Sequence, residues 1–570
     1  MAEKNQTVTL TVEGYTAEGL GVGRTEEGMA VFVPGAARGD RLEALLVKVK
    51  KTYAFGKLLR VLEPSPHRVE PDCPVFAKCG GCDFRHLTYE EELRLKAERV
   101  RDAMERIGGF AVSLPEIVPS PAVAGYRNKA VFPLGEADGQ IVFGLYRSRS
   151  HALVPVISCA IQTKEACALA AAVCRWAEEC GASVYDERTH TGLLRHVAVR
   201  QGEGGCQLTV IAAADALPRE VRLVSLAREA VPALQGVILN VNKTPGNRIL
   251  GDTCRTVWGE DRLTDTLAGH AFSLSPLSFY QVNHGQTEQL YAYAASLAAP
   301  SGDTAALDLY CGIGTITLTL ADRCREVVGV EIVPAAVEDA RQNAARNGVG
   351  NVRFLCADAG QAAERLAEEG FQPEVIVVDP PRKGLDEAAV RAICRMAPAR
   401  VVYVSCDCAS MARDARLLRE LGGYAPVALK AFDMFPRTAN VETVCLLSKL
   451  NEAKHHVNVK LDMDELDLTS AEAKATYKEI EEWVQEHYGF HVTNLNIAQV
   501  KQKHGIIERE NYNKPKSENS RQPGCPSELP ISEADLNATN DMPPTKGRGR
   551  YICEEKFKAI EDAMRYFQMI

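Results

Sequence analysis

Apolar and polar residues alternate along residues 5–62, in the segments TVTLTV, MAVFVP, RLEALLVKVK and AFGKLLRVL. This period of two, with glycine-rich stretches between the segments, predicts a small five-stranded antiparallel barrel of the OB-like kind. Three prolines then end the pattern. Residues 88–108 carry apolar side chains at steps of three and four, which predicts an amphipathic helix. Residues 125–275 are expected to be mainly strands, with one helix near 163–181.

The pattern changes at about residue 300, where strand-like and helix-like segments begin to alternate. AALDLYCG predicts a buried strand with its turn, TITLTLA a helix, EVVGVEI a strand and AAVEDARQNAARNG a helix. VRFLCAD, EVIVVDPP and RVVYVSC add further strands. Such alternation predicts a doubly wound, Rossmann-like α/β sheet, which VETVCLLSKL closes by residue 450.

Residues 451–570 show a third pattern. SAEAKATYKEIEEWVQEHYG predicts a helix with a serine N-cap and a glycine stop, and EEKFKAIEDAMRYF predicts a short closing helix. Between them, residues 513–550 are polar and rich in Pro, Asn and Ser, which predicts a flexible loop. We therefore expect an α-rich extension that is separate from the α/β sheet.

Composition is that of a globular chain of several domains, with 46% hydrophobic and 25% charged residues over 570 positions. We find no apolar run long enough to span a bilayer and no basic-then-apolar leader, so we expect a cytoplasmic protein without a membrane partner. The net charge of −9 argues against bulk nucleic-acid binding. Residues 38–60, however, carry seven basic side chains, and a local basic stripe matters more for phosphate contact than the total charge. The same stripe could equally be a solvated strand face.

The segment DLYCGIG (308–314) lies between a predicted strand and a predicted helix, where glycines allow the backbone to approach a ligand closely. Glu331 ends the next predicted strand, about 20 residues on, where a ribose hydroxyl needs an acceptor. The third glycine of a dinucleotide fingerprint is replaced by Thr317. The pattern therefore favours a methyl donor, with a dinucleotide as the alternative.

Two further motifs also follow predicted strands. Asp379-Pro380-Pro381-Arg382 forms a rigid loop at a strand's C-terminal end, where such sheets bind ligands, although a plain strand-ending turn would look the same. Cys406 ends another strand. Alkylation of an unactivated uracil carbon needs a nucleophile that first adds to carbon 6, and a thiolate is both a strong nucleophile and a good leaving group. A base must then remove the proton from carbon 5, and Glu442 is the candidate.

Four cysteines have a spacing that suggests metal binding. Cys73, Cys79 and Cys82 lie close together and Cys159 follows much later, which matches four-cysteine ligation. Structural zinc sites usually have two Cys-x2–4-Cys pairs, and only one such pair is present. The spacing therefore favours an iron–sulfur cluster over zinc. The fourth cysteine argues against radical chemistry at an open iron.

Seven motifs occur in one order: CPVFAKCGGC (73–82), YRNK (126–129), SFYQVN (278–283), YCG (310–312), DPPRKG (379–384), SC (405–406) and VE (441–442). Together they resemble the bacterial RNA uracil-5-methyltransferases, specifically the iron–sulfur type with an N-terminal TRAM domain that acts on 23S ribosomal RNA. The resemblance covers about residues 1–450. Members that act on transfer RNA generally lack both the barrel and the cluster, so the resemblance favours ribosomal RNA.

The resemblance implies S-adenosylmethionine as methyl donor and a 4Fe–4S cluster, with Cys406 as nucleophile and Glu442 as base. It implies donor contacts from Gln281, Tyr310, Glu331 and Asp379, and cluster ligation by Cys73, Cys79, Cys82 and Cys159. Two residues depart from the commoner pattern of the family: Arg85 replaces a Gln and Asn440 replaces a His. Both departures could bear on substrate choice.

We therefore expect a monomeric enzyme of four parts. These are a TRAM barrel (1–63), a mainly β central domain with the cluster loop (64–275), a methyltransferase domain (276–450) and an accessory extension (451–570). Three alternatives stay open: the same chemistry on transfer RNA, a non-catalytic RNA-binding protein with a decayed methyltransferase domain, and a cysteine-dependent cytosine-5 methyltransferase.

Overall fold

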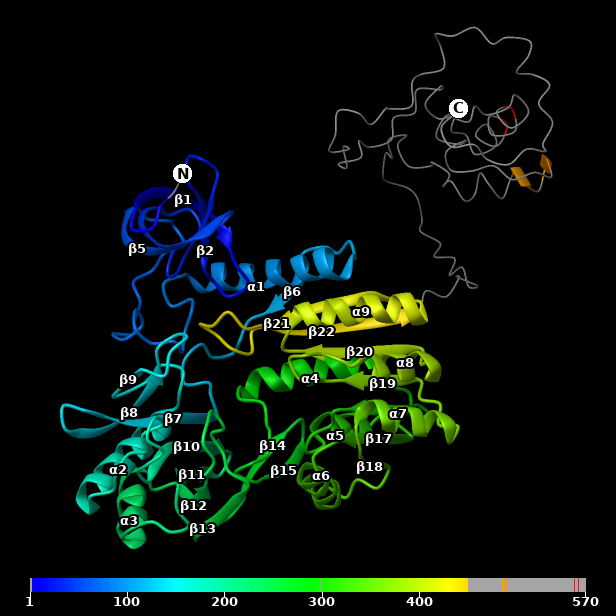
Figure 1. Cartoon of the computed structure of the whole chain (residues 1–570). Helices are drawn as coiled ribbons and strands as arrows, with labels where there is room; N and C mark the ends of the chain where they lie inside the picture. Colours follow the sequence, from blue (N-terminus) through cyan, green and yellow to red (C-terminus); the bar gives the residue numbers. More distant parts are fainter. Residues whose placement is uncertain are drawn as a thin grey trace, which may run out of the picture. The chain divides into compact units, whose positions relative to one another are not determined.

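The computed structural model describes residues 3–298 and 300–449, together with residues 484, 485, 487, 488, 558 and 562. The chain divides into two compact units, Met1–Lys454 and His455–Ile570. The helices expected in the extension and the loop expected over 513–550 lie outside the described residues. The account below concerns the first unit (Figure 1).

The N-terminal strands form a closed barrel in the order β1-β2-β3-β5-β4. The strands are β1 (Thr7–Tyr15), β2 (Gly21–Arg24), β3 (Ala30–Val33), β4 (Arg41–Val49) and β5 (Tyr53–Glu63). Alternate side chains such as Val31, Val33 and Leu42 are fully buried inside, as the period of two predicts. The expectation of a purely antiparallel barrel was wrong, because β3 and β5 pair in parallel to close it.

One long helix connects the barrel to the α/β domain. Helix α1 (Tyr89–Ala103) begins at Thr88, whose side chain accepts a hydrogen bond from the backbone of Glu91, and it ends in the π-helical turn η1 (Met104–Gly108). This confirms the helix predicted over 88–108. The helix contacts α9 (Cys408–Gly422), and the following strand β6 (Glu116–Val118) joins the edge of the α/β sheet. Residues that lie far earlier in the sequence therefore complete the fold of the α/β domain.

The central domain is a seven-stranded sheet in the order β13-β12-β11-β10-β7-β8-β9. Its strands are β7 (Lys129–Ala137), β8 (Gln140–Tyr146), β9 (Leu153–Pro155), β10 (Leu194–Gly202), β11 (Gly205–Ala212), β12 (Leu234–Val241) and β13 (Thr253–Gly259). Helix α2 (Lys164–Cys180) matches the helix expected near 163–181. Helix α3 (Glu220–Ala230) was missed, because it is short and buries only three apolar side chains, Leu223, Leu226 and Ala227.

The α/β domain that follows is an eight-stranded sheet in the order β18-β17-β16-β19-β20-β22-β21-β6. Its strands after β6 are β16 (Ala305–Leu309), β17 (Glu326–Glu331), β18 (Val352–Cys356), β19 (Val375–Val378), β20 (Arg400–Ser405), β21 (Tyr424–Phe432) and β22 (Glu442–Lys449). Strands β16 to β20 pair in parallel, whereas β22 is antiparallel to both of its neighbours. This arrangement confirms the doubly wound α/β expectation.

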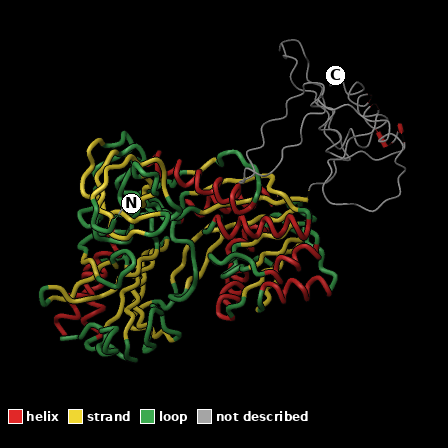
Figure 2. Tube along the Cα trace, turned by 45° about the horizontal axis from the view of Figure 1, so that its top comes forward, coloured by secondary structure: helices red, strands yellow, loops and turns green. Residues whose placement is uncertain are grey.

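Helices cover both faces of this sheet, and each face has its own apolar core. The helices besides α9 are α4 (His284–Ala298), α5 (Thr315–Ala321), α6 (Pro334–Arg346), α7 (Ala359–Glu368) and α8 (Glu387–Met396). The hairpin of β14 (Leu263–Leu267) and β15 (His270–Leu274) buries Leu263, Phe272 and Leu274 in one of these cores. Figure 2 shows the contrast between this layered α/β part and the strand-rich barrel and central sheet. Among the described helices, none is long and apolar enough to cross a membrane.

Candidate functional site

The candidate site lies at the C-terminal ends of four adjacent parallel strands. In the order β17-β16-β19-β20, these ends carry Glu331, the turn with Tyr310, Asp379 and Cys406. The chain winds away from β16 in one direction through β17 and β18, and in the other direction through β19 and β20. Such a switch point leaves a crevice at the C-terminal edge of the sheet, where α/β proteins bind ligands.

The turn after β16 is fixed by Glu331. The backbone N–H groups of Gly312 and Val333 donate to its two carboxylate oxygens, at 3.1 and 2.9 Å. Tyr310 has a φ of 69°, a left-handed conformation that is uncommon for residues other than glycine. Gly314, with φ 87°, begins α5 at a position where a Cβ would lie 3.3 Å from Ala340 and Phe354. The turn therefore has one well-defined conformation.

Asp308 is the first residue of the DLYCGIG motif, and the sequence analysis did not predict it as a site residue. It is fully buried, and its Oδ2 accepts a 2.6 Å hydrogen bond from the hydroxyl of Thr317, the residue that replaces the third glycine of a dinucleotide fingerprint. Its Oδ1 has no hydrogen-bond partner among the described residues. Burial raises the pKa of Asp308 to about 7, and the charges of Asp379 and Glu331 add to this effect.

Cys406 and Glu442 come together through strand pairing. Strands β20 and β22 are antiparallel, and Ser405 lies opposite Thr443. The same register places Cys406, the residue after β20, beside Glu442, the first residue of β22. Glu442 is 2% exposed, whereas Cys406 is partly exposed. A thiol that a ligand can reach therefore lies next to a buried carboxyl group.

The electrostatic environment of this pair opposes negative charge. Burial raises the pKa of Cys406 to about 11, and the nearby Glu442 and Asp379 carboxylates raise it further than Arg382 lowers it. Burial raises the pKa of Glu442 to about 8 and that of Asp379 to about 7. Acidic groups that crowd a buried site hold protons near neutral pH, and a bound cation would favour their ionised forms.

Gln281, the remaining predicted donor contact, lies in the segment that leads into α4. Its side chain is buried, and its backbone carbonyl accepts a 2.9 Å hydrogen bond from the side chain of Asn128 in the central domain. Asn283, two residues on, donates to the Met434 carbonyl at 3.1 Å. This segment is thus held between the central domain and the loop that precedes Glu442.

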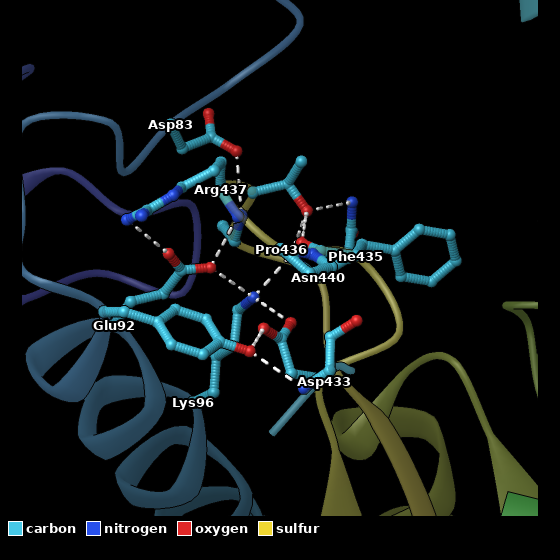
Figure 3. A network of polar contacts seen from close by, with 12 residues as sticks. Asp83, Glu92, Lys96, Asp433, Phe435, Pro436, Arg437 and Asn440 are labelled. Carbon is cyan, nitrogen blue, oxygen red and sulfur yellow. Dashed lines mark hydrogen bonds and ion pairs between the residues drawn. The ribbon is translucent and has the colours of Figure 1, made fainter. Parts of the chain in front are cut away.

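That loop, residues 433–441, is anchored by a buried polar network (Figure 3). The ammonium group of Lys96 on α1 donates to Glu92 at 2.8 Å, to Asp433 at 2.6 Å and to the Phe435 carbonyl at 3.2 Å. Glu92 also accepts the backbone N–H of Arg437 at 2.6 Å. Lys96 is 1% exposed, and Glu92 and Asp433 are fully buried. A charge triad on α1 and the loop therefore holds the segment that leads into Glu442.

Two more elements hold the same loop. The carboxylate of Asp83, next to Cys82, accepts the backbone N–H of Ala439 at 2.8 Å, and the Tyr126 hydroxyl donates to the Pro436 carbonyl at 3.0 Å. At the far end of the loop, Asn440 accepts a 3.3 Å hydrogen bond from Arg382. Hydrogen bonds therefore join the loop 433–441 to the cysteine segment, to the central domain and to Arg382.

The four predicted cysteine ligands line one small cavity, together with Arg85 and apolar side chains. All four are free and partly buried. Burial raises the pKa of Cys82 to about 11, although the Arg85 guanidinium opposes this effect. Among the described residues, no group of three or more potential ligands is arranged to hold a single metal ion.

The basic stripe over 38–60 is partly neutralised. Arg38 pairs with Glu91 and Glu98 on α1, and two more of its arginines pair within the barrel, Arg41 with Glu63 and Arg60 with Glu43. The remaining basic residues are Lys48, Lys50, Lys51 and Lys57, all exposed. The solvent-facing rings of Phe32, Tyr53 and Phe55 form a cluster with centroids 5.5–5.8 Å apart. The part of the stripe that is free for phosphate contact is thus smaller than its sequence suggests.

Comparison with known proteins places this site in context. The family model described as tRNA (Uracil-5-)-methyltransferase matches residues 261–450, and the TRAM domain model matches residues 2–59. An RNA methyltransferase of Halalkalibacterium halodurans is 43% identical over 451 residues, which cover 79% of this chain and 98% of the relative. One of Clostridium tetani is 39% identical over 454 residues, with the same coverage.

Among solved structures, the chain is similar to the Pyrococcus abyssi tRNA (uracil-54, C5)-methyltransferase in complex with S-adenosyl-L-homocysteine. The TM-score is 0.63 at 27% sequence identity, and the match covers 77% of this chain and 100% of that one.

Proposed function

Because this chain belongs to the family of S-adenosylmethionine-dependent RNA (uracil-5-)-methyltransferases, we propose that it methylates carbon 5 of a uridine in 23S ribosomal RNA. The resemblance stated from its motifs is confirmed at the level of the family. The observation that carries the residue-level proposal is the register of β20 and β22, which sets Cys406 beside Glu442 at the edge where Asp379 and Glu331 lie.

Each step uses a group at this edge. The Cys406 thiolate adds to carbon 6 of the uracil, and the electron pair moves to carbon 5 as an enolate. Carbon 5 then takes the methyl group from the sulfonium of S-adenosylmethionine, whose carbon–sulfur bond breaks to leave S-adenosylhomocysteine. The Glu442 carboxylate removes the proton from carbon 5, the double bond re-forms, and the bond between carbon 6 and sulfur breaks to release Cys406.

The donor set at the switch point fits a cationic methyl donor. We assign the donor contacts to Gln281, Tyr310, Glu331 and Asp379. The Oδ1 of Asp308 has no hydrogen-bond partner among the described residues, and the pKa values of Asp308 and Asp379 are raised. Both observations indicate carboxyl groups that a bound cation would stabilise in their ionised form. A sulfonium would supply that positive charge, whereas the pyrophosphate of a dinucleotide would add negative charge.

Substitution of Cys406 by alanine tests the proposal. Cys406→Ala should abolish methyl transfer to RNA while the Kd for S-adenosylmethionine changes less than about threefold, because the thiol adds to the uracil and does not hold the donor. Isothermal titration and incorporation of labelled methyl groups would measure the two quantities. Retained methylation by this variant would refute the role of Cys406, and a donor affinity near zero in the wild-type protein would favour a non-catalytic RNA-binding protein.

Transfer RNA is the second candidate substrate. The matched family model and the Pyrococcus abyssi structure both name tRNA, and that structure aligns over 77% of this chain. Unmodified 23S ribosomal RNA and tRNA transcripts should be incubated with the enzyme in parallel, and nuclease fragments should be analysed by mass spectrometry. We expect 5-methyluridine in the ribosomal RNA alone; 5-methyluridine confined to tRNA, or 5-methylcytidine in either, would refute the assignment. Cytoplasmic location and a monomeric state remain predictions.

We propose that the cysteine cavity holds a 4Fe–4S cluster and not a single zinc ion, because the spacing of the four cysteines along the sequence favours a cluster. A single zinc needs four sulfurs within about 2.3 Å of one point, whereas a cluster places each thiolate on a different iron. The four cysteines line one cavity, and Arg85, which lines it too, would offset part of their negative charge. Cys73, Cys79, Cys82 and Cys159 would hold the cluster, which would then stabilise the segment that leads to Asp83.

Iron content tests this assignment independently of activity. Anaerobically purified protein should contain about four irons and absorb visible light, and Cys79→Ser should lose both properties. Cys180→Ser, at the end of α2 and outside the cavity, is the matched control and should keep them. Stoichiometric zinc without iron would overturn the cluster.

A further inference from the structure

Two cations face each other in the central sheet. Strands β7 and β10 are antiparallel, and Lys129 lies directly opposite Arg200. Residues that are directly opposite in an antiparallel pair have their side chains on the same face, within about 5.5 Å at Cβ. Neither residue takes part in an ion pair among the described residues. Like charges in such a position destabilise the pair of strands.

Burial makes this arrangement more costly. Arg200 is 4% exposed, one of its terminal nitrogens donates to the Ser278 carbonyl at 2.6 Å, and the other has no acceptor among the described residues. Burial lowers the pKa of Lys129 to about 8, and the positive charge of Arg200 adds to that effect. The carboxylate of Asp265 influences Arg200 from a distance, but its oxygens accept from the Glu203 backbone and face His284.

Arg195, on the same strand as Arg200, is a buried arginine whose guanidinium is held by hydrogen bonds within the protein. Its guanidinium donates to three backbone carbonyls, those of Asn242, Thr244 and Gly246, at 2.7–3.1 Å. Arg200 makes one such bond and has a second cation as its neighbour. A folded protein retains a buried, uncompensated pair of cations at a cost that an anionic ligand would remove.

We propose that Lys129 and Arg200 form an anion site that binds a phosphodiester group of the RNA substrate. This inference rests on the proposed function, since it assigns part of the RNA path. Lys129 is the partly exposed member and would contact the phosphate. Arg200 is the more deeply buried of the two, and its positive charge would add to the electrostatic attraction of the phosphate.

The surroundings favour RNA as the source of the anion. Arg200 holds the carbonyl of Ser278, and the next residue, Phe279, is a 72% exposed aromatic side chain that a base could stack on. Asn128, adjacent to Lys129, holds the carbonyl of Gln281. The anion site therefore adjoins residues 278–281, the segment that carries the proposed donor contact Gln281.

The test is RNA affinity, measured by fluorescence anisotropy with a labelled substrate fragment at several salt concentrations. Lys129→Met should raise the Kd at least about tenfold and reduce the slope of log Kd against log salt by about one. In the absence of RNA the same variant should melt at an equal or higher temperature, because it removes a like-charge contact. Lys129→Arg, which keeps the charge, should stay within about threefold of wild type.

Lys449→Met is the matched control. Lys449 is partly buried and is the last residue of β22, at the end of that strand away from Glu442, with its ammonium 5.5 Å from the centroid of the Tyr424 ring. It should change neither the Kd nor the salt slope. Inorganic phosphate, added at constant ionic strength, should raise the melting temperature of the wild type more than that of Lys129→Met if the site also accepts the free anion.

Several results would overturn the inference. They are an unchanged Kd and slope in Lys129→Met, equal losses in Lys129→Met and Lys129→Arg, and a loss of S-adenosylmethionine affinity without a loss of RNA affinity, which would assign the cations to the donor's carboxylate. Stabilisation by free phosphate with unchanged RNA affinity would also refute it. Because these measurements concern binding, they are independent of whether Cys406→Ala abolishes methylation.

Discussion

At the scale of single residues, Cys406 and Glu442 are both held in their protonated forms, whereas the proposed reaction needs both of them ionised. Cys406 must react as a thiolate and Glu442 must accept a proton, yet burial and nearby carboxylates raise the pKa values of both. We therefore expect that a bound cation is needed to bring Cys406 and Glu442 into their ionised, reactive forms. The methyl donor brings a sulfonium, so donor binding and proton release should be coupled.

This coupling predicts a pH dependence of donor binding. The pKa values of Asp379 and Glu442 are raised to about 7 and about 8, so both groups are largely neutral at pH 6 and largely ionised at pH 9. Affinity for the sulfonium should therefore rise by about tenfold between pH 6 and 9, since each carboxylate adds attraction as it ionises. Calorimetric titrations in buffers of different ionisation enthalpy would also show proton release. S-adenosylhomocysteine, whose sulfur is neutral, is the control, and an equal pH dependence for both ligands would contradict the coupling.

Glu442 should act after methyl transfer. Glu442→Gln keeps the shape of the side chain but cannot accept the proton from carbon 5, so enzyme and methylated RNA should accumulate as a covalent complex. A denaturing gel with labelled RNA would show the complex as a slower band, which Cys406→Ala should lack. Wild-type turnover without that band would remove Glu442 from the mechanism.

At the scale of elements, the loop 433–441 depends on a helix that lies more than 300 residues earlier in the chain. Lys96 on α1 contacts Glu92, Asp433 and the backbone of the loop, and the three charged side chains are buried. Removal of one member of a buried charge group leaves its partners uncompensated, which costs far more than the loss of an exposed ion pair.

Lys96→Met should therefore lower the free energy of unfolding by about 3–5 kcal/mol. Because the loop leads directly into Glu442, proton removal should slow as well, so the covalent complex should accumulate while the donor Kd stays near wild type. Tyr89→Phe, which loses a 2.7 Å hydrogen bond to Asp433 and the 2.9 Å bond that its hydroxyl accepts from the Ser120 N–H, should show a smaller effect in the same direction. Arg94→Met breaks an exposed pair with Glu98 on the same helix and should cost less than about 1 kcal/mol. Equal stability losses in Lys96→Met and Arg94→Met would contradict the role of the network.

At the scale of the whole molecule, every residue assigned a role lies in the first compact unit, Met1–Lys454. The relatives support this division, since the Halalkalibacterium halodurans protein matches 79% of this chain yet is itself covered over 98% of its length. The extension after residue 450 brings net negative charge, which suits phosphate contact poorly.

Truncation after Leu450 should leave a folded enzyme that still methylates naked ribosomal RNA. Initial rates on one RNA fragment, full-length against truncated at two salt concentrations, would measure the effect. A loss of more than about tenfold, equivalent to ~1.4 kcal/mol of transition-state stabilisation, with an unchanged melting profile would place the extension in the substrate site.

The sequence by itself determined the order and type of most elements, because a period of two or of 3.6 is a local property of the chain. It also placed Glu331, Asp379 and Cys406 at one edge of the α/β sheet, since the C-terminal ends of parallel strands lie at the same edge. The motifs, read with the family they resemble, assigned each of these groups a role. Helix α3 was missed because its three buried side chains give too weak a periodic signal.

Only the tertiary structure decided which distant residues meet. The register of β20 against β22 brings Cys406 beside Glu442, and that of β7 against β10 sets Lys129 opposite Arg200. Likewise, the parallel pairing of β3 with β5 closes the barrel, and burial places Lys96 between Glu92 and Asp433. Strand register and burial arise from packing between segments far apart in the chain, so no local pattern of residues encodes them.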